Sequence, residues 1–394
     1  MHDGKLRIAI FSDSYLPILN GVSISIDMLV NELRSRGHIV HIYTSGRKGH
    51  KDSDPNIYRF LASETPWTKG YPIALPPFFP MLHRFRSHTY DLIHTHTMFT
   101  VGFVGFRWGQ THDLPIVSTY HTLYDRYAHY IPFFPRRYLR FKCAKHTNYY
   151  YNRVDEVITP SEASLKWLRR HSVTTPVTVI PTGIPGRRLM DRSEIRAELG
   201  IQPNQRVMLY VGRIAQEKNL VGLFQMAQIA FRQDPSLSLW LVGDGPFRKE
   251  AAQMLREFEI GDRVRFVGAL PRAEVDKYYA SADLFVFCSI TETQGLVVQE
   301  AMTYGLPAIV AQGGGAGANV IDGMNGYVVP NNPEIMANHA VRVLNDDKLY
   351  AQLSEGALRS TRDSGAGAMC DGVLDVYRRA IGAHSELTTL VRTI

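Results

Sequence analysis

The chain alternates short, mostly apolar runs with longer stretches of helical spacing, and this alternation restricts its fold more than any other feature. In the first half the apolar runs are Leu6–Phe11, His38–Tyr43, Asp91–His94, Ile116–Tyr120, Val154–Thr159 and Val177–Ile180. Between the first two runs, Gly21–Arg36 carries apolar residues at the spacing of one helix face. Continuous apolar runs separated by helices indicate parallel strands that are buried on both faces of a sheet.

The same pattern begins again after a turn-rich stretch at residues 181–186. The second set of runs and helical stretches is Val207–Val211, Leu220–Gln233, Leu237–Val242, Phe247–Phe258, Val264–Val267, Ala273–Ala280, Leu284–Phe287 and Pro307–Val310. We therefore predict an α/β protein of two Rossmann-like βαβ domains, residues 1–185 and 186–394. The last helical stretch, about Asp371–Ala383, is free to pack on either domain. Two such domains leave a cleft, and ligands of open α/β sheets bind beyond the carboxyl ends of the strands.

Length and charge agree with two globular domains. The 394 residues are 45% hydrophobic and 21% charged, which excludes a disordered chain. The net charge of +7 is uneven, because residues 1–186 hold 22 Lys+Arg against 13 Asp+Glu and the remainder holds 22 against 24. The basic surface is therefore expected mainly on the N-terminal half.

Cysteine usage and hydropathy point to the cytoplasm. Three widely spaced cysteines, Cys143, Cys288 and Cys370, form neither a disulfide framework nor a zinc spacing. The N-terminus leads into a strand and not into a signal-peptide core, and no run approaches the ~20 apolar residues of a membrane span. Membrane contact, if present, is expected to be peripheral.

The strongest chemical motif is the segment 291–302, which follows the strand Leu284–Phe287 and opens a helix at about Gly295. Free N–H groups at a helix start bind anions. Glu292 before the helix and Glu300 inside it could accept hydrogen bonds from hydroxyls on either side of a bound phosphate. A sugar–diphosphate–ribose ligand has hydroxyl groups on both sides of its diphosphate and fits this arrangement. By spacing alone, a capped helix with two surface glutamates is the alternative.

Two further loops follow strand ends. Arg213 and Lys218 flank the loop after Val207–Val211, and two cations there suit a diphosphate. The alternative is a surface arginine and a Lys–Glu pair. The loop 13–23 occupies the Rossmann phosphate position without GxGxxG, so a NAD-type fingerprint is absent. Gly21 could still bring backbone close to a ligand, or the loop is only a helix cap.

Together these residues resemble the retaining glycosyltransferases of family 4, which have the GT-B fold and a Glu-x7-Glu motif. The resemblance covers nearly the whole chain. It implies two domains that face each other across a cleft. It also implies that Arg213 and Lys218 grip the donor pyrophosphate, that Glu292 holds donor-sugar hydroxyls and that Glu300 holds the ribose.

The resemblance assigns the remaining donor residues as well. Backbone at Gln294, Gly295 and Leu296 would meet sugar and phosphate, Gly21 would lie near the diphosphate, and His121 would face the donor sugar. In addition, Val267 lies where relatives bind the base, and Asp244 either is structural or lines the nucleotide site. Relatives often carry a glutamate near Ala318, so the role of the glycine-rich segment 313–317 stays open.

No metal or other cofactor is expected. The GT-B resemblance implies that cations and a helix N-terminus neutralise the leaving diphosphate. Asp52-Ser53-Asp54 matches a DxD metal motif but is interpreted as a solvated loop. His94 and His96 lack an evident third ligand and are interpreted as packing at a strand end.

The acceptor is expected on the N-terminal domain. A basic stretch with interleaved aromatic residues spans 135–146 and includes Arg136, Arg137, Arg140, Lys142 and Lys145. With the apolar loops 130–134 and 71–82 it suits an anionic membrane surface, and a surface helix with buried proline loops is the alternative. Nucleic acid is a poorer interpretation.

The local sequence of residues 292–296 most resembles that of the bacterial diacylglycerol glucosyltransferases. We therefore expect transfer of a hexose, glucose, from a UDP-sugar to a lipid hydroxyl such as that of diacylglycerol, on the inner face of the plasma membrane. The alternatives are a polysaccharide or other glycolipid transferase (mannosyl or sulfoquinovosyl), a nucleotide-sugar epimerase of the same fold, and a sugar-nucleotide binder without catalysis.

Overall fold

A computed structural model describes residues 4–64, 72–123 and 135–393. The chain divides into two compact units, Met1–Gly183 with Ala366–Ile394, and Ile184–Gly365. The second unit is thus one continuous segment, whereas the first is completed by the last helix of the chain. Among the described residues, no helix combines the length and the apolarity that a membrane crossing requires.

The first unit is built on a parallel sheet with the strand order β3-β2-β1-β6-β7-β8-β9. Its strands are β1 (Arg7–Ser12), β2 (Ile39–Ser45), β3 (Ile57–Phe60), β6 (Leu92–Thr95), β7 (Ile116–Thr119), β8 (Glu156–Thr159) and β9 (Val177–Val179). A two-residue ribbon, β4 (Ala62–Ser63) and β5 (Ile73–Ala74), lies apart from this sheet. The predicted parallel arrangement is confirmed, although the pattern did not predict the short strand β3.

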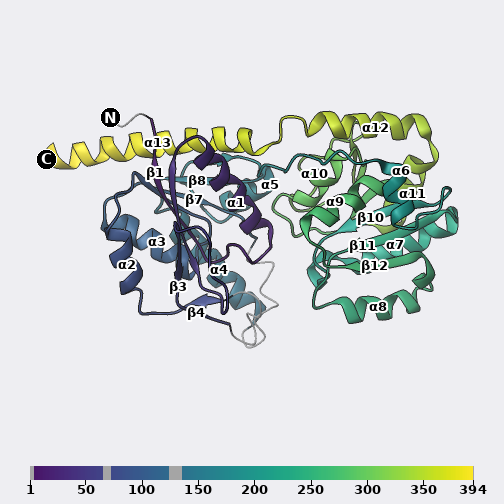
Figure 1. The fold of residues 1–394 in the computed structure, drawn as a ribbon, viewed down its shortest axis with the longest axis horizontal. Coiled ribbons are helices and arrows are strands. Elements are labelled where there is room, and N and C mark those ends of the chain that lie inside the picture. The colour runs from purple at the N-terminus through teal and green to yellow at the C-terminus, as the bar shows by residue number, and fades with distance from the viewer. Residues whose placement is uncertain (1–3, 65–71, 124–134, 394) are drawn as a thin grey trace. The chain divides into compact units, whose positions relative to one another are not determined.

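Alternate residues of each strand fill two separate cores, because successive side chains of a strand point to opposite faces. On one face, Ile8 and Ile10 pack with α1 (Gly21–Ser35) and α13 (Ala366–Thr393). On the other face, Ala9 and Phe11 belong to an aromatic core with α2 (Phe79–Arg86) and α3 (Thr100–Thr111). Figure 1 shows α13 in yellow running alongside α1 and the sheet.

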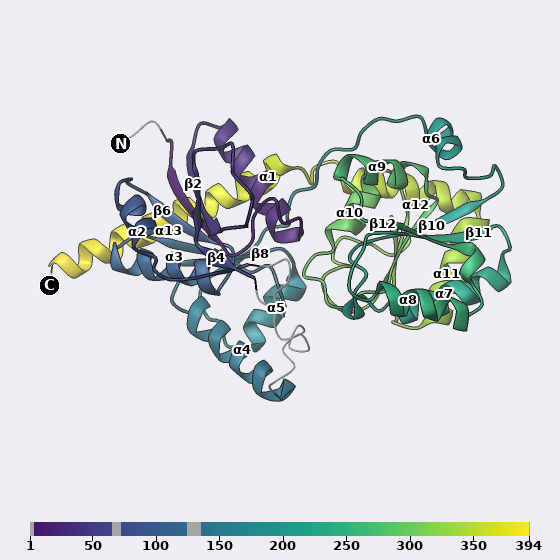
Figure 2. The same ribbon diagram turned by 60° about the horizontal axis from the view of Figure 1, so that its bottom comes forward.

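The remaining helices of the first unit are α4 (Arg136–Tyr151) and α5 (Glu162–Arg170). Buried Tyr150 and Tyr151 at the end of α4 pack with Trp167 of α5, so the C-terminal turn of α4 is anchored in the core. The rest of α4 projects from the unit, as Figure 2 shows. The predicted apolar loop 71–82 is partly wrong, because α2 already begins at Phe79; a proline in the first helical turn, here Pro80, is compatible with a helix.

The second unit has a parallel sheet with the order β12-β11-β10-β13-β14-β15. Its strands are β10 (Arg206–Val211), β11 (Leu237–Val242), β12 (Val264–Gly268), β13 (Leu284–Phe287), β14 (Ala308–Ala311) and β15 (Gly326–Val329). Its helices are α6 (Arg192–Glu198), α7 (Leu220–Gln233), α8 (Arg248–Glu257), α9 (Arg272–Ser281), α10 (Leu296–Thr303), α11 (Pro333–Asn345) and α12 (Asp347–Ser360), with short 3-10 turns η2 (Gln216–Lys218) and η3 (Gly261–Arg263). One contiguous apolar core covers this sheet.

Candidate functional site

The strand order of the second unit marks one place for a ligand. From β10 the chain moves outward to β11 and β12, and then returns to add β13 on the other side of β10. The loops that leave the carboxyl ends of β10 and β13 therefore diverge, and Rossmann-like sheets bind ligands at this topological switch point. These two loops are residues 212–219 and 288–295, which carry the predicted cations and the first motif glutamate.

Lys218 and Glu292 meet at the switch point. Lys218 Nζ donates a hydrogen bond to Glu292 Oε1, and Ser289 Oγ donates to the same oxygen at 3.1 Å. The two loops are also joined by Thr291 Oγ1, which donates to the Glu217 carbonyl at 3.3 Å. The side chains of Lys218 and Glu292 are 13% and 20% exposed. A largely buried ion pair, 74 residues apart in sequence, is thus built from two residues that the motifs had singled out separately.

Arg213 has a different carboxylate partner, which the sequence did not assign. Its Nη2 donates to Glu217 Oε1, four residues later, and the Glu217 side chain is almost fully buried. Tyr210 Oη donates to the Arg213 carbonyl at 3.0 Å, which fixes the backbone at the strand end. The alternative of a surface arginine and a Lys–Glu pair is thus met in part: Lys218 does pair with a glutamate, Glu292, whereas Arg213 is half-buried and paired with Glu217.

The helix start between the two motif glutamates lacks a side-chain cap. Gly295 is the N-cap of α10 in the left-handed conformation, with φ 72°, and no side chain accepts from the first turn. Buried Gln294 donates its Nε2 to Gln299 Oε1 at 2.7 Å, so its amide is directed to the helix. Leu296 is the first helical residue. The uncapped N–H groups of an eight-residue helix can bind an anion.

The glycine-rich segment 313–317 supports this loop from behind. Gly315 N–H donates to the Glu292 carbonyl at 2.6 Å. A Cβ at Gly315 would lie 1.8 Å from the Thr293 carbonyl oxygen, and one at Gly314 would lie 2.6 Å from that of Ile290. Only glycines allow two backbone segments to approach so closely. The run of glycines was the available signal for this supporting role, which is independent of the glutamate expected near Ala318.

Glu300 is buried and not a surface glutamate. It is 4% exposed, accepts a hydrogen bond from Tyr279 Oη at 2.9 Å, and forms an ion pair with Arg272 Nη1 at 2.5 Å. The alternative of a capped helix with two surface glutamates is therefore wrong. The sequence analysis missed Arg272 and Tyr279. Arg272 precedes the predicted helix Ala273–Ala280, and no local pattern links it or Tyr279 to Glu300, because the two partners lie on α9 and Glu300 lies on α10.

Asp244 lies in the turn after β11, and Val267 lies on β12. The turn after β11 is fixed by backbone, because the Asp244 carbonyl accepts from Ile214 N–H at 3.0 Å and Gly243 N–H donates to the Gly268 carbonyl at 2.8 Å. The Asp244 carboxylate is exposed and accepts from Gly245 N–H at 2.8 Å. Val267 is half-buried on the edge strand. Asp244 therefore has a structural role in this turn, and its contact with a nucleotide stays a prediction.

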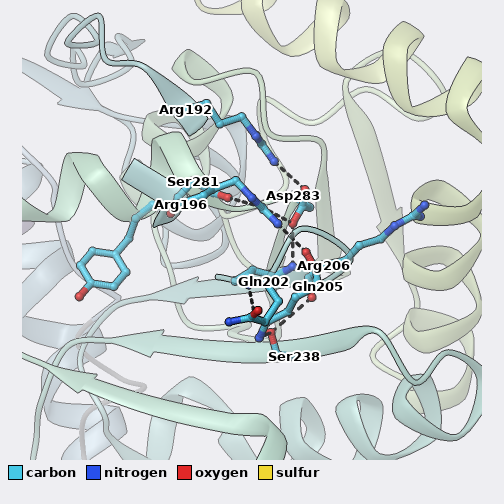
Figure 3. Close-up of polar contacts among 10 residues, drawn as sticks. Arg192, Arg196, Gln202, Gln205, Arg206, Ser238, Ser281 and Asp283 are labelled. Carbon is cyan, nitrogen blue, oxygen red and sulfur yellow. Dashed lines mark hydrogen bonds and ion pairs between the residues drawn. The ribbon is translucent and has the colours of Figure 1, made fainter. Parts of the chain in front are cut away.

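The amino ends of the same strands carry a second polar cluster that has a structural role. Asp283 accepts from Arg192 at 2.6 Å, from Arg196 at 3.1 Å and from Val207 N–H at 2.7 Å, as Figure 3 shows for the side chains. These bonds attach α6 to the sheet. A hollow of about 580 Å³ at this end is lined in part by Arg196 and Asp283, which pair with each other, and it lies at the amino ends of the strands and not at their carboxyl ends.

The first unit has its own switch point between β1 and β6. There Asp13 accepts from Thr97 Oγ1 and from Val101 N–H at 2.8 Å, and so caps α3 from another loop. Burial raises the pKa of this carboxyl. Gly21 is the exposed first residue of α1, whose N-cap Asn20 accepts from Ser23 N–H at 2.9 Å. The helix-cap interpretation of loop 13–23 is thus observed, and a ligand at Gly21 stays a prediction.

Three histidines gather at the carboxyl ends of β6 and β7. His94 is hydrogen-bonded to Tyr377 Oη and Thr119 Oγ1, both at 2.7 Å, and burial lowers its pKa to about 3. His96 Nδ1 lies 2.8 Å from His121 Nε2, and burial lowers the pKa of His121 to about 4. The packing interpretation of His94 agrees with these contacts. In the described residues no group of three or more His, Cys, Asp or Glu side chains could hold a metal ion.

The DxD-like segment is not a solvated loop. Asp52 accepts from Arg59 Nε at 2.6 Å, and Asp54 accepts from Arg34 Nη1 at 2.5 Å. Both carboxylates are more than half buried. The sequence-based interpretation is therefore wrong about solvation, because two arginines on α1 and β3 recruit these aspartates as structural partners.

Comparison with known families defines the class of protein. The description "Glycosyltransferase Family 4" matches residues 19–188, and "Glycosyl transferases group 1" matches residues 191–360. With its two parallel-sheet α/β units, the chain belongs to this family of glycosyltransferases, which has the GT-B fold. The family and fold expected from the sequence are confirmed.

Individual relatives within this family are similar to the chain over most of its length. The alpha-monoglucosyldiacylglycerol synthase of Streptococcus pneumoniae (strain ATCC BAA-255 / R6) is 32% identical over 77% of this chain and 70% of that protein. The alpha-monoglucosyldiacylglycerol synthase of Acholeplasma laidlawii is 30% identical over 91% of this chain and 93% of that protein. A solved sucrose-phosphate synthase from Thermosynechococcus elongatus matches 96% of this chain and 100% of its own, with a TM-score of 0.78 and 24% identity, which is a likeness of fold.

Proposed function

We propose that this glycosyltransferase transfers glucose from UDP-glucose to a hydroxyl of a lipid acceptor such as diacylglycerol, with retention at the anomeric carbon. The observation that carries the proposal is the similarity to two proteins named alpha-monoglucosyldiacylglycerol synthase, one of them along nearly its whole length. The charges at the switch point of the second unit support a diphosphate donor.

The chemical difficulty of the reaction is the charge on the departing diphosphate. Arg213, Lys218 and the uncapped N–H groups of α10 would stabilise this charge, and preorganised electrostatic groups of this kind commonly dominate catalysis. Glu217 and Glu292 hold the two cations in place before the donor binds. Glu292 would then hydrogen-bond donor-sugar hydroxyls. The proposed chemistry requires neither a metal nor another cofactor.

The other donor contacts follow from the same resemblance. Glu300 would hold the ribose, Val267 and Asp244 would lie at the base and nucleotide, and Gly21 would approach the diphosphate. His121 would position the donor sugar. A pKa of about 4 makes His121 a weak base at neutral pH, which agrees with positioning and not with proton abstraction. The departing phosphate oxygen would take the acceptor proton.

The helix α4 is the proposed contact with the membrane. The exposed residues Arg137, Arg140, Lys142 and Lys145 all lie on it. Lys142 Nζ lies 5.9 Å from the ring centroid of Tyr138, and Lys145 Nζ lies 4.9 Å from that of Phe141, and both rings are exposed. Arg136 is its first residue. Each basic residue near an anionic surface contributes about 1 kcal/mol, and exposed aromatic rings suit the lipid interface.

Part of the apolar segment 71–82 is also exposed and supports a membrane contact of the first unit. Phe79 at the start of α2 is 77% exposed, and Leu75 and Ile73 are also exposed, so the alternative of buried proline loops is wrong for these side chains. The segment 130–134 lies outside the described residues. We propose a cytoplasmic enzyme that is peripheral on the inner face of the plasma membrane.

The test is a donor panel with a lipid acceptor. The purified protein is incubated with radiolabelled UDP-glucose, UDP-galactose or GDP-mannose and with vesicles that contain diacylglycerol, and the organic phase is counted. The proposal is supported if label from UDP-glucose enters the lipid and an α-glucosidase then releases that label. Label only in water-soluble glycan, label from GDP-mannose alone, or sugar interconversion without transfer would each contradict it.

The membrane contact is tested separately by co-sedimentation with vesicles of phosphatidylglycerol. Charge reversal at Arg140 and Lys145 should weaken binding at least tenfold, because two like charges then face the anionic lipid. The matched control reverses Lys249 and Arg256, two exposed residues of α8 in the other unit, and should bind as before. Equal binding by both double variants would refute the assignment of α4.

A further inference from the structure

His96 is a buried imidazole that the proposed reaction does not use, and its position is defined by a neighbouring imidazole. It follows β6, whereas His121 follows the adjacent strand β7. The two ring nitrogens His96 Nδ1 and His121 Nε2 are 2.8 Å apart, and the ring planes differ by 20°. A hydrogen bond between two imidazole nitrogens contains one proton, so one ring donates and the other accepts.

Both rings are neutral in the folded protein. His96 is 2% exposed, and His94 lies against it with ring centroids 4.0 Å apart. Burial and the nearby imidazoles lower the pKa of His96 well below its usual range, and burial lowers that of His121 to about 4. Each neutral ring therefore carries a single proton, on Nδ1 or on Nε2.

The second nitrogen of His96 decides between the two arrangements. Within the described residues, His96 Nε2 is buried and has no hydrogen-bond partner. A buried N–H without an acceptor is rarer and costlier than an acceptor whose lone pair is unused. The proton of His96 therefore belongs on Nδ1, where His121 Nε2 accepts it. His121 must then carry its own proton on Nδ1.

We propose that His96 is a positioning residue that fixes the tautomer of His121, so that His121 presents Nδ1–H as a hydrogen-bond donor. In the proposed function, a donor-sugar hydroxyl that contacts His121 Nδ1 would accept this hydrogen bond through its oxygen. Only this last clause rests on the proposed function, in which His121 contacts the donor sugar. The tautomer itself is a property of the protein without substrate.

The direct test uses the wild-type protein labelled with ¹⁵N-histidine. A long-range ¹H–¹⁵N correlation spectrum at pH 7.5 distinguishes protonated from unprotonated ring nitrogens, and single His96 and His121 variants assign the signals. We expect both rings to be protonated at Nδ1 and unprotonated at Nε2. A proton at Nε2 of His121 would overturn the proposal, whatever the activity of the enzyme.

Two variants then separate tautomer control from simple packing. His96→Asn retains an N–H near the Nδ1 position, whereas His96→Leu removes the donor but keeps an apolar filling. We expect the His96→Leu spectrum to lose the single Nδ1–H tautomer of His121 and the donor KM to rise about two- to tenfold, the value of one hydrogen bond. His96→Asn should restore both properties.

The outcomes remain distinct if the proposed reaction is wrong. An unchanged His121 tautomer in a folded His96→Leu protein refutes the role of His96, even when that variant loses activity. A shifted tautomer without any change in donor KM supports the role of His96 but refutes the sugar contact of His121. If His96→Leu does not fold, as judged by circular dichroism, the wild-type spectrum still decides the proposal.

Discussion

Replacing Gly315 by alanine should separate the activity of the protein from its stability. The added Cβ would lie 1.8 Å from the Thr293 carbonyl oxygen, far inside the 3.0 Å below which such contacts essentially never occur. One backbone segment must therefore move by more than about 1 Å, and the hydrogen bond from Gly315 N–H to the Glu292 carbonyl must lengthen. A displacement of about 1 Å at catalytic groups costs about 100-fold in rate.

We expect kcat/KM of Gly315→Ala to fall about 100-fold, while overpacking lowers the unfolding free energy by about 1–3 kcal/mol. Radiolabelled transfer to lipid measures the first quantity, and urea unfolding followed by circular dichroism measures the second. The matched control is Gly261→Ala, where a Cβ meets nothing within 4 Å, and it should keep wild-type activity. A Gly315→Ala enzyme with kcat/KM within threefold of wild type would refute the supporting role of the glycine-rich segment.

Three further predictions concern single side chains. Arg213→Ala should lower turnover by roughly 100-fold or more, because it removes a cation from the proposed leaving group, and near-normal turnover in the radiolabel assay would contradict that role. Arg272→Gln removes the ionic partner of Glu300 and should abolish the preference for UDP over its 2′,3′-dideoxy analogue in inhibition assays; an unchanged preference would count against a ribose site. His94 has a pKa of about 3 when folded and about 6.5 when unfolded. Its contribution to the free energy of unfolding is therefore constant above pH 6.5 and is lost as the pH falls toward 3. Between pH 7.5 and pH 5 this group should lower the free energy of unfolding by about 2 kcal/mol. Urea unfolding of His94→Gln should show a decrease that is smaller by that amount.

The architecture could be predicted from the sequence because strand burial leaves a local signal. The predicted strand bounds lie within about two residues of the observed ones in both sheets, for example Leu6–Phe11 against Arg7–Ser12. The edge strands β3 and β15 were missed because Arg59 interrupts the apolar run of the first, and Gly326 begins the second, and both are only partly buried. Short edge strands carry too few apolar residues for a continuous run to be visible.

The partners within the site could not be predicted, because they depend on tertiary packing. Spacing placed Lys218 and Glu292 at two strand ends, and the strand order alone brings those ends together. Nothing local indicates that Glu300 is held by Arg272 from a different helix. The same limit explains Asp52, whose solvation was misjudged because its arginine partner is defined only once β3 is formed.

The return of α13 to the first unit has a consequence for how the protein is made. The chain leaves that unit after Gly183 and re-enters it at Ala366, so 182 residues are synthesised in between. At ~5–20 residues per second this takes roughly 10 to 40 s. During that time the sheet face around Ile8, Ile10 and Val40 lacks Val376 and Tyr377, which complete its core. The first unit to begin leaving the ribosome is therefore the last to close, and its apolar face stays uncovered and accessible to chaperones until α13 has been made.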